Sequence, residues 1–227
     1  MNFIEGEVLL FNKPYQWTSF DLVRKVRNMV KAKSKVSKIK VGHAGTLDPL
    51  ATGLLIVCTG KFTKQINSFQ DLDKEYLAGL LIGKTTHSFY LEKEYDFEYP
   101  TDHINKELVE EVLKSFLGDS DQIPPVFSAK FIDGKRAYEY ARKGDMIEMK
   151  PCRINISEIE LLRYDLPEIT IRIRCSKGTY IRSLVRDIGE RLNSGATMIS
   201  LQRTAIGSYQ VNNALSIEEF ENKLAHL

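Results

Sequence analysis

The amino-acid sequence predicts an α+β fold in which helices flank a central mixed, mostly antiparallel sheet. Predicted strands outnumber predicted helices and do not alternate regularly with them, which disfavours a doubly wound parallel sheet. Residues 168–175 alternate isoleucine with threonine and arginine, the pattern of a strand with one buried face. The 227 residues contain no repeat and no Pro/Ser-rich linker, so residues 1–227 are expected to form a single domain.

Strands are predicted where runs of β-branched, aliphatic and aromatic residues are bounded by Pro, Gly or charged residues. These runs cover residues 7–12, 54–59, 74–82, 126–132, 152–164 and 168–175. The stretch from 122 to 151 is rich in basic and aromatic side chains. We expect it to form a thumb-like lobe inserted in the sheet.

Helices are predicted where an apolar face follows a side chain that can cap a helix. The candidate caps are Thr18, Asn105, Thr179 and Ser216, and Glu219 would complete a capping box with Ser216. The predicted helices cover residues 20–31, 106–117, 138–143, 179–193 and the segment after 216.

Charge is unevenly distributed along the chain. Lys and Arg number 32 against 30 Asp and Glu, so the net charge of +2 indicates little about binding partners. Residues 24–40 contain Lys and Arg but no acid, which makes them a candidate footprint for a phosphate backbone. The alternative interpretation is a solvated helix face followed by a loop. The cations are Arg24, Lys25, Arg27, Lys31, Lys33, Lys35, Lys38 and Lys40.

Residue spacing excludes several kinds of site. Cys58, Cys152 and Cys175 are widely spaced and the four histidines form no ligand cluster, so we expect a reducing compartment and no metal. Residues 83–85 (GKT) lack the glycine that a nucleotide-binding P-loop requires five positions earlier. No leader peptide and no apolar run of membrane-spanning length are present, so we expect a cytoplasmic protein without membrane contact.

The most distinctive segment is the loop Gly42–Gly53, with the sequence GHAGTLDPLATG. It is too polar and too rich in glycine for a helix or a strand. Asp48 is its only acid, and no other acid lies between Asp21 and Asp48. A rigid loop that presents one carboxylate among cations is typical of a catalytic site.

Several motifs, in their order along the chain, resemble the bacterial tRNA pseudouridine 55 synthases of the TruB type. The resemblance extends from about Val8 to Gly207, and the long loop motif is its most specific part. The matching segments are Lys13-Pro14 with Thr18-Ser19, Gly42–Gly53, Lys74–Tyr76, Pro125–Lys130, Ser176–Leu184 and Leu201–Thr204.

The resemblance implies that Asp48 is the nucleophile in the isomerisation of uridine 55, in the T-loop of tRNA, to pseudouridine. This reaction involves no redox change, so no cofactor is expected. Arg182 matches the family arginine that pairs with the aspartate and keeps it ionised. Tyr76 matches the tyrosine that stacks on the flipped base and is a candidate proton acceptor.

The resemblance also implies a set of substrate-binding positions. Tyr180 and Leu201 match residues that line the base pocket, and His43 matches a histidine that fills space around the flipped base without acting as acid or base. Lys13 matches a lysine that supports the Asp48 loop or a phosphate. The expected partner is the T-arm stem-loop of tRNA, on which the thumb closes, and the protein is expected to be a monomer.

The sequence departs from the family pattern in two places. Many members carry a C-terminal RNA-binding domain of the PUA type, which we do not expect here because only about twenty residues follow Gly207. His87 and Tyr90 stand where many members have acids, so Tyr90 would supply a hydrogen bond in place of a charge near Arg182. Glu92 is a candidate substitute acid.

Two other functions compete with this interpretation. One is a non-catalytic RNA-binding protein or tRNA chaperone on the same scaffold, which the change at Tyr90 favours. Retention of Asp48, Tyr76 and Arg182 argues against it. The other is a glycoside hydrolase, which would need a second carboxylate at a recognisable site that the sequence lacks.

Overall fold

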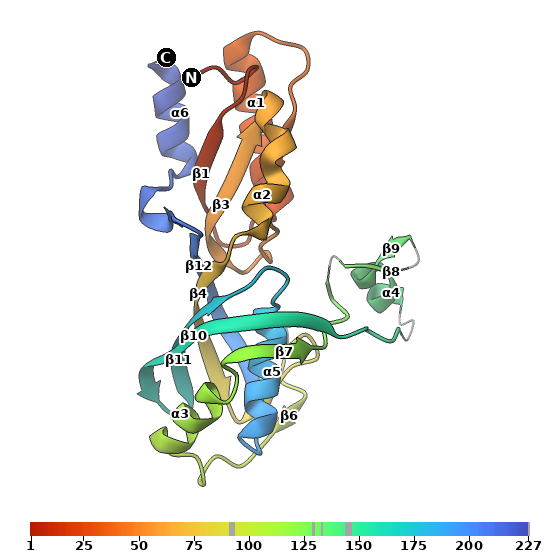
Figure 1. The fold of residues 1–227 in the computed structure, drawn as a ribbon, viewed down its shortest axis with the longest axis vertical. Coiled ribbons are helices and arrows are strands. Elements are labelled where there is room, and N and C mark those ends of the chain that lie inside the picture. The colour runs from red at the N-terminus through yellow and green to blue at the C-terminus, as the bar shows by residue number, and fades with distance from the viewer. Residues whose placement is uncertain (91–93, 129, 133, 144–146, 227) are drawn as a thin grey trace. The chain divides into compact units, whose positions relative to one another are not determined.

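The computed structural model describes residues 1–90, 94–128, 130–132, 134–143 and 147–226. Its elements confirm the predicted α+β fold with a mixed, mostly antiparallel sheet (Figure 1). The chain divides into two compact units, of which unit 1 is Met1–Leu77 with Ser200–Leu227 and unit 2 is Ala78–Ile199. Strands β4 (Lys74–Ile82) and β12 (Ala196–Ile206) continue from one unit into the other. The single catalytic domain over residues 1–227 stays a prediction.

The sheet of unit 1 is centred on β3 (Thr52–Thr59). This strand is antiparallel to β1 (Val8–Lys13) and to the short β2 (Val41–His43). It is parallel to β12, with Gly53 opposite Arg203. β13 (Tyr209–Gln210) pairs antiparallel with the end of β12.

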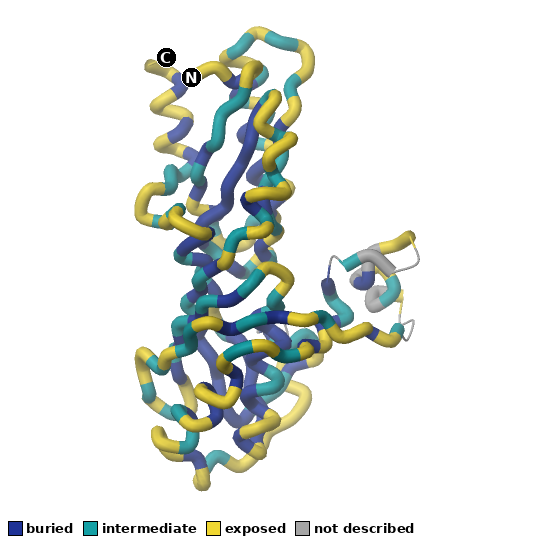
Figure 2. Tube along the Cα trace, viewed as in Figure 1, coloured by how far each residue is buried: buried dark blue, intermediate teal, exposed yellow. Residues whose placement is uncertain are grey.

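Helices cover both faces of β3. Leu55 and Val57 pack into a core that includes α1 (Ser19–Ser34) and α6 (Ile217–Ala225). Leu54 and Ile56 pack on the other face, in a core that includes Phe69 of α2 (Ile66–Asp71). β3 is therefore buried on both faces, as Figure 2 shows, and this explains its unbroken apolar sequence. Two short 3-10 helices complete unit 1, η1 (Gly60–Gln65) and η2 (Val211–Asn213).

The start of α1 is fixed by a capping box. The Thr18 hydroxyl accepts from the Asp21 amide at 3.0 Å, and the Asp21 carboxylate accepts from the Thr18 amide at 3.1 Å. The predicted cap at Thr18 is thus confirmed. The helix ends at Lys35, which adopts a left-handed φ of 52°.

In unit 2 the sheet continues through β4, β11 (Glu168–Cys175), β10 (Cys152–Asp165) and β7 (Gly118–Gln122). The last three strands pair antiparallel. Ile169, Ile171 and Ile173 are buried, while the threonine and arginines between them are half-buried, which confirms the alternation predicted for β11. The helices of unit 2 include α3 (Lys106–Lys114), capped by Asn105 as predicted, and α5 (Ile181–Arg191).

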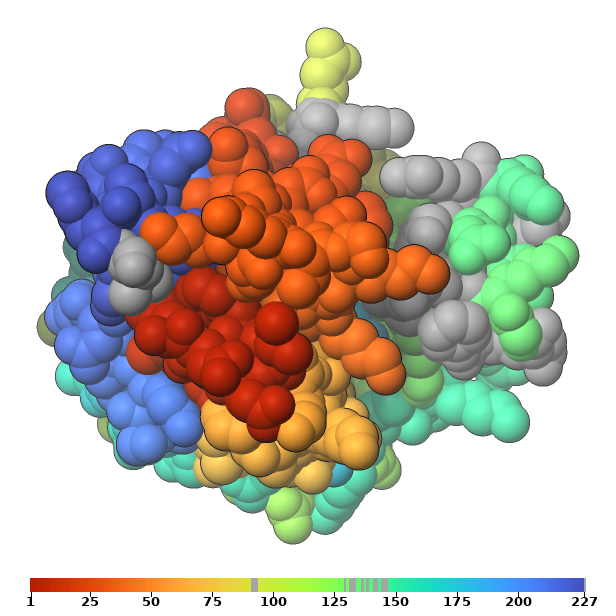
Figure 3. Space-filling view, turned by 90° about the horizontal axis from the view of Figure 1, so that it is seen from above, coloured from red at the N-terminus to blue at the C-terminus, as the bar shows by residue number. Residues whose placement is uncertain are grey.

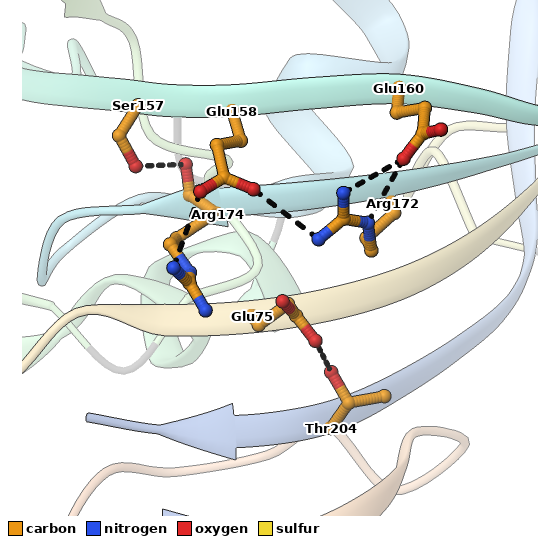
Figure 4. A network of polar contacts seen from close by, with 7 residues as sticks. All are labelled: Glu75, Ser157, Glu158, Glu160, Arg172, Arg174 and Thr204. Atoms are coloured by element: carbon orange, nitrogen blue, oxygen red, sulfur yellow. Dashed lines mark hydrogen bonds and ion pairs between the residues drawn. The ribbon is translucent and has the colours of Figure 1, made fainter. Parts of the chain in front are cut away.

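The outward face of β10 and β11 carries a ladder of ion pairs (Figure 4). Glu158 accepts from Arg172 and from Arg174, at 3.3 and 3.2 Å. Glu160 accepts from Arg172 at 2.8 Å. These side chains are partly exposed, so each pair is worth at most about 1 kcal/mol. Their main effect is to provide hydrogen-bond acceptors for the guanidinium groups of Arg172 and Arg174.

The segment predicted to form a thumb makes a small lobe that stands off the sheet of unit 2 (Figure 1). It consists of β8 (Phe131–Ile132), β9 (Lys135–Arg136) and α4 (Ala137–Lys143). A further pair of short strands, β5 (Lys84–Thr85) and β6 (Phe97–Glu98), pairs antiparallel outside the main sheet.

Several predicted details of the elements are wrong. Residues 126–128 are not strand, because the Ser128 amide donates to the Val126 carbonyl at 2.9 Å in a tight turn that a strand cannot contain. The strands β2, β7, β12 and β13 of the main sheet were not predicted, and both ends of the Gly42–Gly53 segment, expected to be loop, belong to β2 and β3. Helix α3 ends at Lys114 rather than at 117, and the N-cap of α5 is Tyr180 rather than Thr179.

Candidate active site

The Asp48 segment is fastened to the N-terminus of α1. The Ser19 hydroxyl accepts from the Leu47 amide at 2.9 Å and donates to the Leu47 carbonyl at 3.3 Å. Leu47 and Ala51 are buried, whereas Asp48 is half-buried between them. The Ala51 amide donates to the Asp48 carbonyl at 3.1 Å and closes a turn. The apolar residues thus anchor the loop while its carboxylate stays accessible.

Lys13 fastens the same loop from the other side. Its side chain is fully buried, and its ammonium donates to the carbonyls of Pro14 at 3.0 Å, Trp17 at 2.5 Å and Pro49 at 3.1 Å. Burial lowers the pKa of Lys13 to about 8, an effect that the nearby charge of Asp48 opposes. Lys13 therefore ties the end of β1 and the start of α1 to the residue that follows Asp48.

Arg203 of β12 holds both ends of the Gly42–Gly53 loop. It is 1% exposed, and its guanidinium donates to the Leu54 carbonyl at 2.8 Å and to the Gly45 carbonyl at 3.1 Å. Sequence reasoning missed this role, because it assigned only Leu201 from the motif that contains Arg203. The segment that contains Arg203 also has polar residues such as Gln202 and was not predicted to be a strand, so no local signal marked the arginine as buried.

His43 lies at the end of β2, at the start of the loop. Burial lowers the pKa of its imidazole, the Arg203 guanidinium lowers it further, and a hydrogen bond with the Gly45 backbone acts in the opposite direction. At neutral pH the ring is therefore uncharged. An uncharged ring provides no cation for a phosphate.

Tyr76 and Leu201 are buried residues of the two strands that leave unit 1, β4 and β12. Beside them, Glu75 accepts from the Thr204 hydroxyl at 2.8 Å (Figure 4). The buried ammonium of Lys74 donates to the carbonyls of Gln70 and Leu72. The motif Lys74–Tyr76 thus joins the end of α2 to the sheet.

Arg182 and Tyr180 lie at the start of α5 in unit 2. Arg182 is buried and donates to the Phe127 carbonyl at 2.7 Å. The Tyr180 amide donates to the Gln122 side chain at 2.8 Å, and that side chain donates back to the Tyr180 carbonyl at 3.1 Å. Burial raises the pKa of the Tyr180 phenol. Within unit 2, both residues are therefore linked to the segment that leads into the lobe.

Tyr90 and His87, the two positions where acids were expected, lie in unit 2. Tyr90 is 1% exposed, and its backbone carbonyl accepts from the Thr86 hydroxyl at 2.9 Å. The ring of His87 lies edge-on to Phe127, with ring centres 5.8 Å apart. Glu92 lies outside the described residues. Tyr90 is thus part of the unit 2 core.

Neither a metal site nor a membrane span is found in the described part of the chain. No group of three or more His, Cys, Asp or Glu side chains there could hold a metal ion. No described helix is both long and apolar enough to cross a bilayer.

Comparison with known proteins identifies the family. Residues 27–181 match the model of the TruB family pseudouridylate synthase (N terminal domain). The chain belongs to this family. Residues 182–226 match the tRNA pseudouridylate synthase B C-terminal domain. The TruB resemblance predicted from the motifs is therefore confirmed.

Curated relatives of this TruB-family chain are similar over nearly their whole length. The tRNA pseudouridine synthase B of Parabacteroides distasonis is 61% identical over 224 residues, which cover 99% of this chain and 95% of the relative. The protein of the same name from Flavobacterium johnsoniae is 52% identical, with 98% and 97% coverage.

Solved structures share the fold. A Cbf5–Nop10–Gar1 complex contains a chain that matches with a TM-score of 0.72 at 24% identity. The match covers 97% of the TruB-family chain but only 54% of that longer chain. An H/ACA RNP bound to a substrate RNA containing 2′-deoxyuridine matches with a TM-score of 0.68.

Proposed function

We propose that this protein is a tRNA pseudouridine synthase that isomerises uridine 55 in the T-loop of tRNA. The full-length curated relatives carry that enzyme name, and the chain belongs to their family. The observation that carries the proposal is the fixation of the Asp48 segment by Ser19, Lys13 and Arg203. A half-buried carboxylate on a loop held at three points is suited to one defined attack geometry.

In the proposed reaction Asp48 is the nucleophile. The bond between N1 of uracil and C1′ of the ribose breaks, the base turns within the site, and C5 bonds to C1′. The proton on C5 is removed and N1 gains a proton, so the product is an isomer of the substrate. Tyr76 is the proposed proton acceptor, and Arg182 is the proposed cation partner of Asp48.

The remaining predicted site residues bind the substrate in this proposal. Tyr180 and Leu201 contact the flipped base, His43 fills space beside it as a neutral ring, and Lys13 acts through the loop backbone. The substrate is the T-arm stem-loop, recognised largely through RNA shape and phosphates. We expect the protein to work as a monomer in the cytoplasm.

The proposal is tested with a T-arm stem-loop that carries tritium at C5 of the target uridine. Isomerisation releases the label to water, so release is expected from the intact substrate and not from one labelled at another uridine. Asp48→Asn should lower release by at least about 10³-fold while RNA binding persists. Near-normal release by this variant would rule out Asp48 as nucleophile. Binding without release by the unmodified protein would favour the RNA-chaperone alternative.

A further inference from the structure

Aromatic side chains are exposed immediately beside the Asp48 loop. Tyr15 is 55% exposed and Phe20 is 59% exposed, although large aromatic side chains usually bury most of their surface. Trp17 lies between them in sequence and is half-buried against the core of unit 1. Three aromatic residues thus occur within six positions at the junction of β1 and α1.

This aromatic segment is held by the same contacts that hold the Asp48 loop. The carbonyls of Pro14 and Trp17 share the Lys13 ammonium with the carbonyl of Pro49. Ser19, adjacent to Phe20, bonds to both backbone groups of Leu47. Tyr15 and Phe20 therefore lie within two positions of Lys13 and Ser19, the residues that bond to the two neighbours of Asp48.

The backbone of this segment is held in a turn. The Trp17 amide donates to the Pro14 carbonyl at 3.4 Å, and Gln16 adopts a left-handed φ of 65°. This conformation is disfavoured for a residue other than glycine and persists only where the surroundings impose it. The fold of unit 1 therefore fixes the backbone that carries the aromatic residues.

Cations and amides line a groove together with Trp17. A shallow groove is lined by Gln16, Trp17, Asp21, Arg24, Lys25 and Asn28. Arg24 pairs with Asp21 at 2.9 Å but remains 62% exposed. Further cations follow along the chain to residue 40, with no acid among them. Figure 3 shows, in orange, the chain that carries the later of these cations at the surface of the viewed face. The combination of open aromatic rings with positive charge complements unpaired nucleotides and their phosphates.

We propose that Tyr15, Trp17 and Phe20 form a stacking platform for the unpaired nucleotides that flank the target uridine, and that Arg24 and Lys25 bind their phosphates. Flipping one nucleotide out of a loop removes stacking from its neighbours. Aromatic rings fixed beside the nucleophile replace part of that stacking. The platform would thus lower the cost of presenting the uridine to Asp48. This inference rests on the proposed function.

The test compares the unmodified protein with the double variant Tyr15→Ser, Phe20→Ser. Binding is measured by fluorescence anisotropy with a T-arm stem-loop, in an Asp48→Asn background so that no turnover occurs. The double variant should bind about 5- to 100-fold more weakly, as expected for the loss of one stacked base. With 2-aminopurine beside the target uridine, the quenching seen with the parent protein should be lost. In the active background KM should rise more than kcat falls.

The matched control is Phe97→Ser, which removes a ring that is 65% exposed in unit 2 and should leave affinity and quenching unchanged. Thermal melting of each variant checks that the fold is retained. Equal affinity and equal quenching in the folded double variant would overturn the platform. Tritium release by the unmodified protein is measured in parallel. Its presence alongside an unaffected double variant would reject the platform alone, whereas its absence would reject the proposed function.

Discussion

The ammonium of Lys13 has three N–H groups, and each has a carbonyl partner. A buried cation is tolerated when all its hydrogen-bonding capacity is used and a negative charge lies nearby. Here the nearby charge is Asp48, whose interaction with Lys13 partly offsets the effect of burial. The protonation of Lys13 and the backbone beside Asp48 are therefore linked.

Activity should decrease with rising pH because Lys13 loses its proton. Its pKa is lowered from 10.5 to about 8. Above pH 8 a neutral amine offers two N–H groups to three carbonyls, so kcat should fall about tenfold per pH unit. Lys13 loses its proton at a lower pH in the folded state than in the unfolded chain. The free energy of unfolding should therefore rise with pH between about pH 8 and 10.5. Tritium release and circular-dichroism melts over pH 7–10 separate the two effects.

The control for this pH profile is Lys13→Met, which removes the titrating group. Its kcat should be low at every pH and should lack the alkaline decrease. An alkaline decrease at the same pH in this variant would assign the titration to another residue.

Motif resemblance predicted Asp48, Lys13 and the other five site residues only as separate positions in the sequence. The sequence could not show that Arg203 is buried, because an arginine within a strand is more often exposed. Its role depends on the carbonyls of Gly45 and Leu54, which are far from it in sequence. Every residue has a backbone carbonyl, so residue types do not indicate which carbonyls a buried arginine will contact.

At the scale of elements, β12 is the strand on which the loop depends. The parallel pairing of β12 with β3 places the Arg203 backbone against Gly53. The Arg203 side chain then reaches both ends of the loop. Gly53 has a φ of 101°, and a Cβ atom there would lie 2.3 Å from the Arg203 carbonyl oxygen. The close approach of the two strands requires glycine at this position.

Gly53→Ala should therefore reduce stability by about 2–5 kcal/mol, through backbone strain and the clash with β12. Gly118→Ala is the matched control, because Gly118 has a φ of 87° but no atom lies within 4 Å of the added Cβ. The control should lose only about 1–2 kcal/mol. Urea unfolding of both variants measures the difference, and equal losses would show that the clash is relieved by a small shift of β12.

Sequence patterns predicted elements with strong local signals and failed for the others. β11 alternates strictly, and α1 and α6 carry capping boxes, so their positions follow from a few adjacent residues. β12 has no such alternation, since its buried positions include Thr197 and Arg203. β7 has the polar sequence GDSDQ and forms a strand only because β10 provides a partner. Both β12 and β7 form strands because they pair with segments that are distant in sequence.

At the scale of the whole molecule, a net charge of +2 conceals a concentrated cationic segment. Lys33, Lys38 and Lys40 are exposed at the end of α1 and in the connection to β2. RNA binding through such residues releases counterions, so its affinity depends on salt concentration. Substitution of these lysines therefore tests the electrostatic attraction to RNA separately from the proposed chemistry at Asp48.

The triple variant Lys33→Ala, Lys38→Ala, Lys40→Ala should bind a T-arm stem-loop with a salt dependence reduced by about 2 in the slope of log Kd against log salt. The value of kcat at saturating RNA should stay near that of the parent. Lys106→Ala, Lys114→Ala, Lys223→Ala makes the same change in charge at other exposed sites. If both triple variants reduced the slope equally, net charge rather than this segment would control binding.

The three attachments of the Asp48 segment also determine when its conformational entropy is lost. Ser19, Lys13 and Arg203 restrain the loop through bonds within unit 1, so its backbone is ordered when the chain folds. A loop that became ordered only on binding would subtract that entropy from the affinity for RNA. In the proposed reaction the free energy of RNA binding therefore remains available for deforming the RNA, and the Asp48 carboxylate is in position before the substrate arrives.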